Sequence, residues 1–172
     1  MKFWMGFLIL PIGLWAASVM EFETLHANFA QQVTNDQNQT LRYTGQVWLK
    51  KPDLALWQYE TPIEKTIYLH GNQVTLIEPE LFQATRFESE LSLNILEAWN
   101  QSRPHKPGER IATVNQNRIL IQHDSDFIRR VSYRDTLDNQ VAIEFLKPVK
   151  NPRLDPGLFM PEIPKGFDLI IH

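Results

Sequence analysis

The sequence predicts a mainly β protein: an unclosed, strongly curved antiparallel β-barrel, or half-barrel. Two observations carry this prediction. From residue 40 onward, short segments that alternate apolar and polar residues recur at regular spacing, with turn-forming residues between them. Helical spacing is found in only two segments, 21–33 and 88–100. Two helices cannot cover so large a sheet, so we expect the sheet to curve around its own apolar face, with the helices over the open side.

Residues 1–18 have the features of a secretory signal peptide. Lys2 precedes an uncharged apolar stretch, and the small residues Ala16 and Ser18 stand at the spacing that signal peptidase reads. We therefore expect cleavage before Val19 and one domain over residues 19–172. The chain of 172 residues contains no cysteine, so stability must come from packing rather than from disulfides.

Residues 21–33 are expected to form an amphipathic helix. Phe22, Leu25, Phe29 and Val33 recur at helical spacing on one stripe, and turn formers follow in 34–40. An apolar stripe of this kind usually packs into a protein core.

The stretch GQVWLKKPDLALWQYETP, which begins at Gly45, predicts a β-hairpin with strands at 46–51 and 54–59 and a turn at Pro52-Asp53. Alternation places one row of side chains on the first face: Val47, Leu49 and Lys51 from one strand, and Ala55, Trp57 and Tyr59 from the other. The opposite face also carries large apolar residues, namely Trp48, Leu54 and Leu56. Both faces of such an apolar hairpin must be covered by other parts of the protein. The position of the charged Lys51 at the end of an apolar row also requires a structural explanation.

The remaining elements continue the pattern. Strands are expected at 65–70, 73–78 and 81–87, then a helix at 88–100 in which Leu91, Ile95 and Trp99 line one side. A loop is expected at 101–109, and four further strands at 110–115, 118–123, 127–135 and 140–147. The tail, 151–172, is punctuated by prolines and ends on a short apolar strand.

The motifs of catalysis are missing from the sequence. It has no G-x-S-x-G elbow, no H-E-x-x-H helix, no phosphate-binding glycine loop and no cysteine nucleophile. His123, Asp124 and Asp126 form the one cluster worth weighing as a metal site, but their position between two strands favours a turn. We predict a protein that is not an enzyme and that has no catalytic residues, metal or cofactor.

Charge also narrows the class of partner. The formal net charge is −3, and no clustered basic surface of the kind that binds nucleic acid is evident. Three arginines in FIRRVSYR, residues 127–134, suggest either a basic patch or an ordinary solvated strand face, and the alternation favours the second.

The order of motifs resembles the periplasmic outer-membrane lipoprotein carrier family, LolA. LHANFAQQV (25–33) resembles the family's first helix, and TGQVWLKKP followed by WQYETP resembles its characteristic hairpin. HGNQVTLIEPELFQAT (70–85), LDNQVAIEF (137–145) and FMPEIPKGFDLI (159–170) resemble its later segments, so the match covers the whole expected mature chain.

This resemblance implies a half-barrel whose helices form a lid over an apolar cavity. It further implies a periplasmic protein that takes acylated lipoproteins from an inner-membrane ABC lipoprotein-releasing complex and delivers them to an outer-membrane acceptor, working as a monomer. The cavity would be lined by Phe22, Leu25, Phe29, Val47, Leu49, Ala55, Trp57 and Tyr59. The lid contacts would be made by Lys51, Leu91 and Ile95.

Two departures from the family pattern bear on function. Lys51 stands where the family typically has arginine, and an ammonium group offers a point charge instead of a planar fork of donors. Ala55 stands where a larger aromatic residue is common, which would widen the cavity locally. An alternative function also stays open: a periplasmic module of the same fold that binds or senses lipid or lipoprotein without transporting it.

Overall fold

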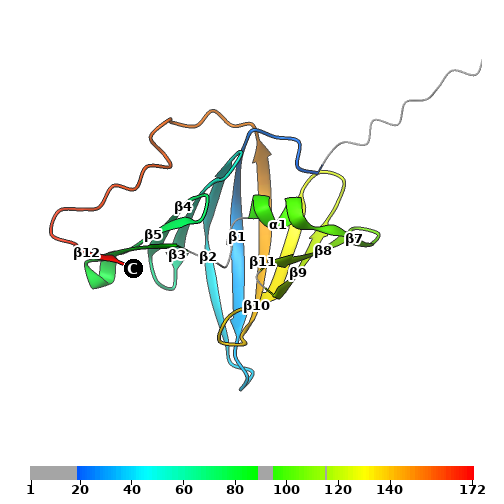
Figure 1. Ribbon diagram of the computed structural model, residues 1–172, viewed down its shortest axis with the longest axis horizontal. Helices are drawn as coiled ribbons and strands as arrows, with labels where there is room; N and C mark the ends of the chain where they lie inside the picture. The colour runs from blue at the N-terminus through cyan, green and yellow to red at the C-terminus, as the bar shows by residue number, and fades with distance from the viewer. Residues whose placement is uncertain (1–18, 89–94, 115) are drawn as a thin grey trace, which may run out of the picture.

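The structure is a computed structural model that describes residues 19–88, 95–114 and 116–172. Within these ranges twelve strands form one open, curved sheet, accompanied by a short α-helix and one turn of 3-10 helix (Figure 1). The strands are β1 Thr24–Thr34, β2 Thr40–Lys50, β3 Leu54–Thr61, β4 Lys65–His70, β5 Gln73–Glu78, β6 Gln83–Glu88, β7 Arg103–Lys106, β8 Glu109–Val114, β9 Asn117–His123, β10 Ile128–Arg134, β11 Gln140–Lys150 and β12 Asp168–Ile171. The helices are η1 Pro79–Leu81 and α1 Ile95–Gln101. The mainly β prediction is therefore confirmed.

Neighbouring strands follow the order β12-β6-β5-β4-β3-β2-β1-β11-β10-β9-β8-β7. Two meanders, β2 to β6 and β7 to β11, are joined in the middle where β1 pairs with both β2 and β11. The pairs are antiparallel with one exception, since β12 adds to the edge strand β6 in the parallel direction. The edge strands β12 and β7 do not pair with each other, so the sheet stays open.

The expected helix at 21–33 is wrong, because this segment forms the central strand β1. Leu25, Ala27 and Phe29 are buried, whereas the residues between them are less buried or exposed, which is the period of a strand. The prediction failed because Leu25, Phe29 and Val33 are four residues apart. That interval keeps side chains on one face of a helix and, being even, also on one face of a strand.

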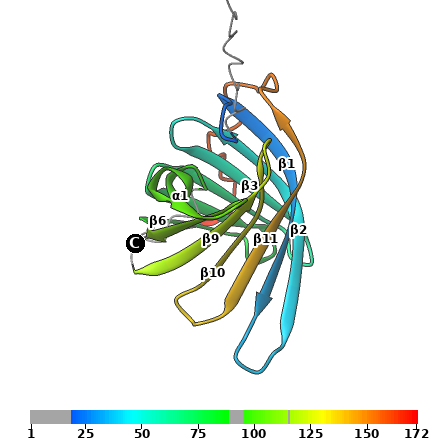
Figure 2. The same ribbon diagram turned by 90° about the vertical axis from the view of Figure 1, so that its right-hand side faces the viewer.

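The core lies on the concave face of the sheet. Figure 2 shows the strong curvature, with α1 on the hollow side. Buried residues of β1, β2, β3, β9, β10 and β11 form one continuous cluster with Ile95, Leu96 and Ala98 of α1. Across the hairpin, the facing pairs on this side are Val47 with Trp57 and Leu49 with Ala55, as alternation predicts.

The tail between β11 and β12 lies on the outer face of the sheet beside β4. Leu56 and Ile77 are buried on this face, outside the main core. The buried Phe159 of the tail lies here too, since its carbonyl accepts a hydrogen bond from His70 Nε2 at 2.7 Å. Burial, aided by Glu162 of the tail, raises the pKa of Tyr68. The concave side of the hairpin is thus covered by the core. On its outer side Leu56 is buried and the ring of Trp48 stacks on His26 at 4.9 Å.

The other differences from expectation concern the middle of the chain. In the described part of the chain, α1 begins at Ile95, and the predicted loop at 101–109 contains the edge strand β7. Of the two expected helices, the described residues contain only the second, as the seven-residue α1, and the expected helical residues 89–94 lie outside the described ranges. No helix within the described ranges has the length and apolar character needed to cross a membrane.

Candidate functional site

The eight residues expected to line a cavity come together on the concave face. They lie on β1, β2 and β3 or just before β1, and each is 5 % exposed or less. All eight belong to the main core cluster, where their side chains pack against one another. The structure therefore groups the predicted residues.

An aromatic row runs through this face. Ring centroids of Phe29 lie 5.0 Å from Trp57 and 4.9 Å from Tyr59, both edge to face. Trp57 continues to Phe145 at 6.0 Å, and the row then passes through Phe127 to Phe22 in steps of 6.0 Å. Offset and edge-to-face contacts of this kind are favourable in addition to the area they bury. The aromatic row consists of Tyr43, Tyr59, Phe29, Trp57, Phe145, Phe127 and Phe22.

Gly45 lets the row approach the sheet backbone. It faces Phe29 on one neighbouring strand and Tyr59 on the other. A Cβ at this position would stand 2.0 Å from the carbonyl oxygen of Gln58 and 2.9 Å from the Phe29 ring. Because backbone cannot yield by that much, only glycine fits here, which explains the glycine that opens the hairpin motif.

One end of the aromatic row is polar. Tyr59 donates a hydrogen bond from its hydroxyl to Gln31 Oε1 at 2.8 Å, and burial raises the pKa of Tyr59. Lys65 Nζ stands 4.4 Å from the Tyr59 ring centroid and 5.1 Å from that of Tyr43. Burial lowers the pKa of Lys65, and the carboxylate of Glu78 opposes this shift. A half-buried cation on two aromatic faces thus closes this end.

A second lysine closes the other end. Lys51 Nζ donates to the backbone carbonyl of Met20 at 2.7 Å and stands 5.2 Å from the Phe22 ring centroid. The Lys51 amide donates to the carbonyl of Glu23 at 2.9 Å. The lysine therefore fastens the segment that precedes β1 to the β2–β3 turn.

A pocket of about 420 Å³ lies beside Lys51 and is lined on its other side by α1. Its walls are Met20, Lys51, Pro52, Leu96, Trp99 and Asn100. The predicted lid residue Ile95 is buried in the main core, and Leu91 lies outside the described residues.

The C-terminal end of α1 is fastened to the sheet. The guanidinium of Arg110 on β8 lies 4.7 Å from the Trp99 ring centroid, and the ring of His123 lies 5.3 Å from it. Arg110 also donates to the Ser102 hydroxyl and carbonyl oxygens, each at 2.7 Å. At the other end of α1, the side chains of Ile95 and Leu96 are buried in the main core.

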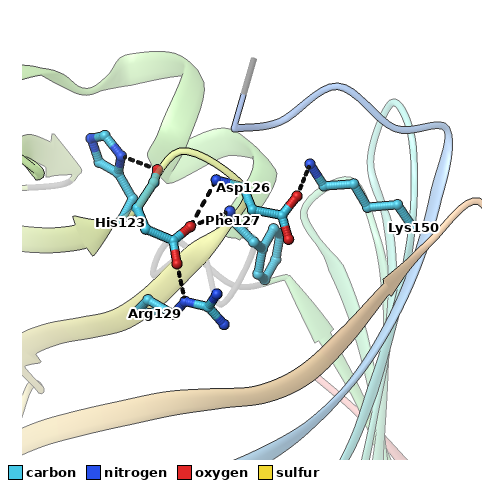
Figure 3. A network of polar contacts seen from close by, with 6 residues as sticks. His123, Asp126, Phe127, Arg129 and Lys150 are labelled. Carbon is cyan, nitrogen blue, oxygen red and sulfur yellow. Dashed lines mark hydrogen bonds and ion pairs between the residues drawn. The ribbon is translucent and has the colours of Figure 1, made fainter. Parts of the chain in front are cut away.

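Polar contacts fix the β9–β10 loop that carries Phe127 (Figure 3). The Phe127 ring in turn contacts Phe22 and Phe145 of the aromatic row. Asp124 Oδ1 accepts the backbone amides of Asp126 at 2.7 Å and Phe127 at 2.9 Å, and its other oxygen pairs with Arg129. Asp126 in turn pairs with Lys150 at 3.1 Å, which ties the loop to the end of β11. The hydrogen bonds from the backbone amides of Phe127 and Asp126, with a smaller contribution from Arg129, lower the pKa of Asp124 to about 2.

These contacts decide two alternatives left by the sequence. The cluster of His123, Asp124 and Asp126 is a turn, and no group of three such side chains in the described ranges could hold a metal. Arg130 and Arg134 pair with Glu144 at 2.7 Å and Asp138 at 3.0 Å on partly exposed strand surface. Carboxylates therefore largely neutralise the positive charge of the arginine-rich segment on the outer face.

Sequence reasoning missed five residues of this face: Gln31, Tyr43, Lys65, Phe127 and Phe145. Phe145 had a usable signal, because it continues the alternation of Val141 and Ile143 on β11. Gln31 would have been placed on the concave face if β1 had been predicted as a strand. Phe127 follows a polar turn, and its role depends on the fold of that turn.

Comparison with known proteins connects this arrangement to a family. The family model described as "Outer membrane lipoprotein carrier protein LolA" matches residues 20–98. Curated proteins named outer-membrane lipoprotein carrier protein are similar over almost the whole chain. The protein from Campylobacter jejuni is 31 % identical over 159 residues, covering 92 % of this chain and 93 % of its own. The protein from Wolinella succinogenes is 32 % identical over 167 residues, covering 94 % and 96 %.

Solved structures share the fold at low sequence identity. An uncharacterized conserved protein from Thermus thermophilus superposes with a TM-score of 0.55 at 9 % identity, covering 88 % of this chain and 92 % of that one. A LolA superfamily protein from Nitrosomonas europaea gives a TM-score of 0.51 at 9 % identity, covering 85 % and 94 %.

Proposed function

Because the chain belongs to the outer-membrane lipoprotein carrier family, LolA, we propose that it binds the acyl chains of lipoproteins against the concave face of its sheet. The family is one of carrier chaperones and not of enzymes, which agrees with the absence of catalytic motifs from the sequence. The observation that carries the proposal is the aromatic row, which sits where the curvature of the sheet would enclose a ligand.

Acyl chains need such a surface. Each methylene group exposed to water costs about 0.8 kcal/mol, so a released lipoprotein must find apolar cover of matching size. The eight predicted site residues supply apolar and aromatic surface from three adjacent strands. These residues pack on one another, so an incoming acyl chain replaces contacts that the core otherwise makes with itself.

For acyl chains to enter, we propose that α1 acts as the lid. Its C-terminal end would stay fastened through Arg110, while the apolar end at Ile95 lifts from the core. The pocket between α1 and Lys51 supports this opening, because packing is already incomplete there. In this proposal Lys51 holds the N-terminal wall of the site rather than contacting α1 through a hydrogen bond.

The same proposal covers location and partners. We propose that residues 1–18 direct export to the periplasm, that residues 19–172 work there as a single monomeric domain, and that no cofactor is involved. The relatives' name, outer-membrane lipoprotein carrier protein, supports lipoprotein cargo. We propose that this cargo comes from an inner-membrane ABC lipoprotein-releasing complex and passes to an outer-membrane acceptor.

Co-purification tests the function. The full chain would be produced with its leader in a bacterial host together with a tagged lipoprotein, and complexes from the periplasm would be examined by native mass spectrometry. The matched control is the same cargo with its acylated cysteine replaced by serine. We expect a one-to-one complex with the acylated cargo only.

Transfer separates a carrier from a module that only binds. The loaded protein would be mixed with outer-membrane vesicles, and the cargo would be followed in the membrane pellet. Movement of cargo to the vesicles is expected of a carrier. Retention on the protein would instead favour the non-transporting alternative, and equal capture of acylated and non-acylated cargo would contradict acyl binding.

A further inference from the structure

The indole nitrogen of Trp57 is a buried donor without an acceptor. In the part of the chain that the structure describes, it is the one buried side-chain nitrogen or oxygen that has no hydrogen-bond partner. Trp57 is 2 % exposed, so solvent does not supply the missing acceptor. Native proteins pair nearly all buried polar groups, so an orphaned donor at the centre of a candidate binding face calls for an explanation.

The surroundings of Trp57 are apolar. Its facing residues on the adjacent strands are Val47 and Ile67, and its ring contacts are with Phe29 and Phe145. Tyr59, the next residue on the same face of β3, differs from Trp57 in this respect, because its buried hydroxyl donates a hydrogen bond to Gln31. The chain thus provides an acceptor for one buried donor of the aromatic row and none for its neighbour.

The chemistry of the site selects the missing acceptor. An indole N–H only donates, so the partner must offer a lone pair. A buried water needs two to four polar partners, and Trp57 provides a single one in an apolar setting. A charged group would be desolvated beside apolar walls. A neutral carbonyl attached to apolar chains meets every condition, and the ester and amide carbonyls of acyl chains are of this kind.

We propose that Trp57 donates a hydrogen bond from its indole nitrogen to an acyl carbonyl, so that the concave face distinguishes acyl chains from plain hydrocarbon. This inference rests on the proposed function, because it assumes that acyl chains reach the concave face. The inference adds that the concave face recognises the polar junction between the acyl chain and the headgroup. The hydrogen bond from Trp57 then sets how deeply the acyl chains enter. Since Trp57 is buried, the bond forms only after the side chains that cover it move aside.

Two glycerol lipids that differ in one feature test the proposal. Dioctanoylglycerol carries two ester carbonyls, and dioctylglycerol is its ether analogue without carbonyls. The mature protein should bind the diester about tenfold more tightly than the diether, the usual effect of one satisfied buried hydrogen bond. Trp57→Phe should bind both lipids with similar affinity, because an ester without a donor gains nothing over an ether.

A second variant separates the donor from the shape of the ring. Replacing Trp57 by benzothienylalanine keeps the bicyclic ring and exchanges only the N–H for sulfur, so it answers the question even where Trp57→Phe fails to fold. In nitrogen-15-labelled tryptophan protein, the indole proton of Trp57 should move downfield with the diester and stay unmoved with the diether. Trp48 and Trp99 serve as internal references.

The outcomes are distinct. Equal affinity of the unaltered protein for diester and diether, or a preference that survives loss of the N–H, would overturn the inference while acyl binding stands. Binding of neither lipid would overturn the inference and the proposed function together. A preference that disappears with the N–H, together with the diester-specific shift of the indole proton, is the expected result.

Discussion

Replacing Lys51 by methionine removes the charge and both of its contacts while keeping the length of the side chain. A hydrogen bond from a charged donor is worth about 1.5–3 kcal/mol, and an exposed cation–π contact about 0.5–1 kcal/mol. Lys51 is only half-buried, which places the total loss near the low end, at about 2 kcal/mol. With a urea slope of roughly 2 kcal/mol per molar, the unfolding midpoint should fall by about 1 M.

The neighbouring Lys50 provides the matched control. Its side chain is exposed and makes no ion pair or hydrogen bond among the described residues. Lys50→Met should therefore change the free energy of unfolding by less than about 0.5 kcal/mol. Lys51→Arg should recover most of the loss because it keeps both the charge and a donor.

Hydrogen exchange locates the effect. The amide of Phe22 donates to the same Met20 carbonyl that accepts from Lys51. If Lys51 fastens this segment, exchange at Phe22 should speed up by roughly 30-fold in Lys51→Met, the ratio that corresponds to about 2 kcal/mol. Equal midpoints for Lys51→Met and Lys50→Met, with unchanged exchange at Phe22, would show that Lys51 is only a charge at the end of a strand.

Three further predictions concern the frame of the site. Gly45→Ala should lower the free energy of unfolding in urea by about 3 kcal/mol or more, because the added methyl would stand 2.0 Å from a carbonyl oxygen of the facing strand. The control Gly157→Ala, at an exposed turn, should change it by no more than about 1 kcal/mol. Equal effects of the two substitutions would refute the close approach at Gly45. The lowered pKa of Asp124 means that its contribution to stability is full above its ordinary pKa near 4 and is lost as the pH falls toward 2. Asp124→Asn should thus be less stable than the unaltered protein at pH 7, and the difference should shrink between pH 4 and pH 2; a difference that does not vary with pH would contradict this. Arg110→Met should speed amide exchange in α1 without changing exchange in β1, and unchanged exchange in α1 would show that the arginine does not fasten the helix.

The hairpin could be predicted from sequence because its signals agree with one another. Val47 and Leu49 alternate with polar or partly exposed residues, and Pro52-Asp53 marks the turn. The first strand could not be separated from a helix, because Leu25 and Phe29 fit both periods. Only the pairing of β1 with strands on both sides decides between the two, and that pairing is not a local property.

Contacts between distant segments explain what else the sequence did not show. Tail residues such as Phe159 have no periodicity of their own and are placed by the outer face that they cover, where His70 supplies a donor. The missing acceptor of Trp57 is likewise invisible in the sequence, since any tryptophan carries the same N–H. Only the full set of neighbours shows that no acceptor is there.

The place of β1 in the sheet also governs how the chain reaches its native state. Each of the two meanders grows by hairpins between strands adjacent in the sequence, and such local pairings form quickly. The joint between β1 and β11 unites segments near opposite ends of the chain, so closing it carries a large loop entropy. A chain that is synthesised from its N-terminus onward must hold β1 without its second partner until β11 has been made. Until then one edge of β1 lies open and the aromatic row lacks Phe127 and Phe145, so aggregation competes with folding in this interval.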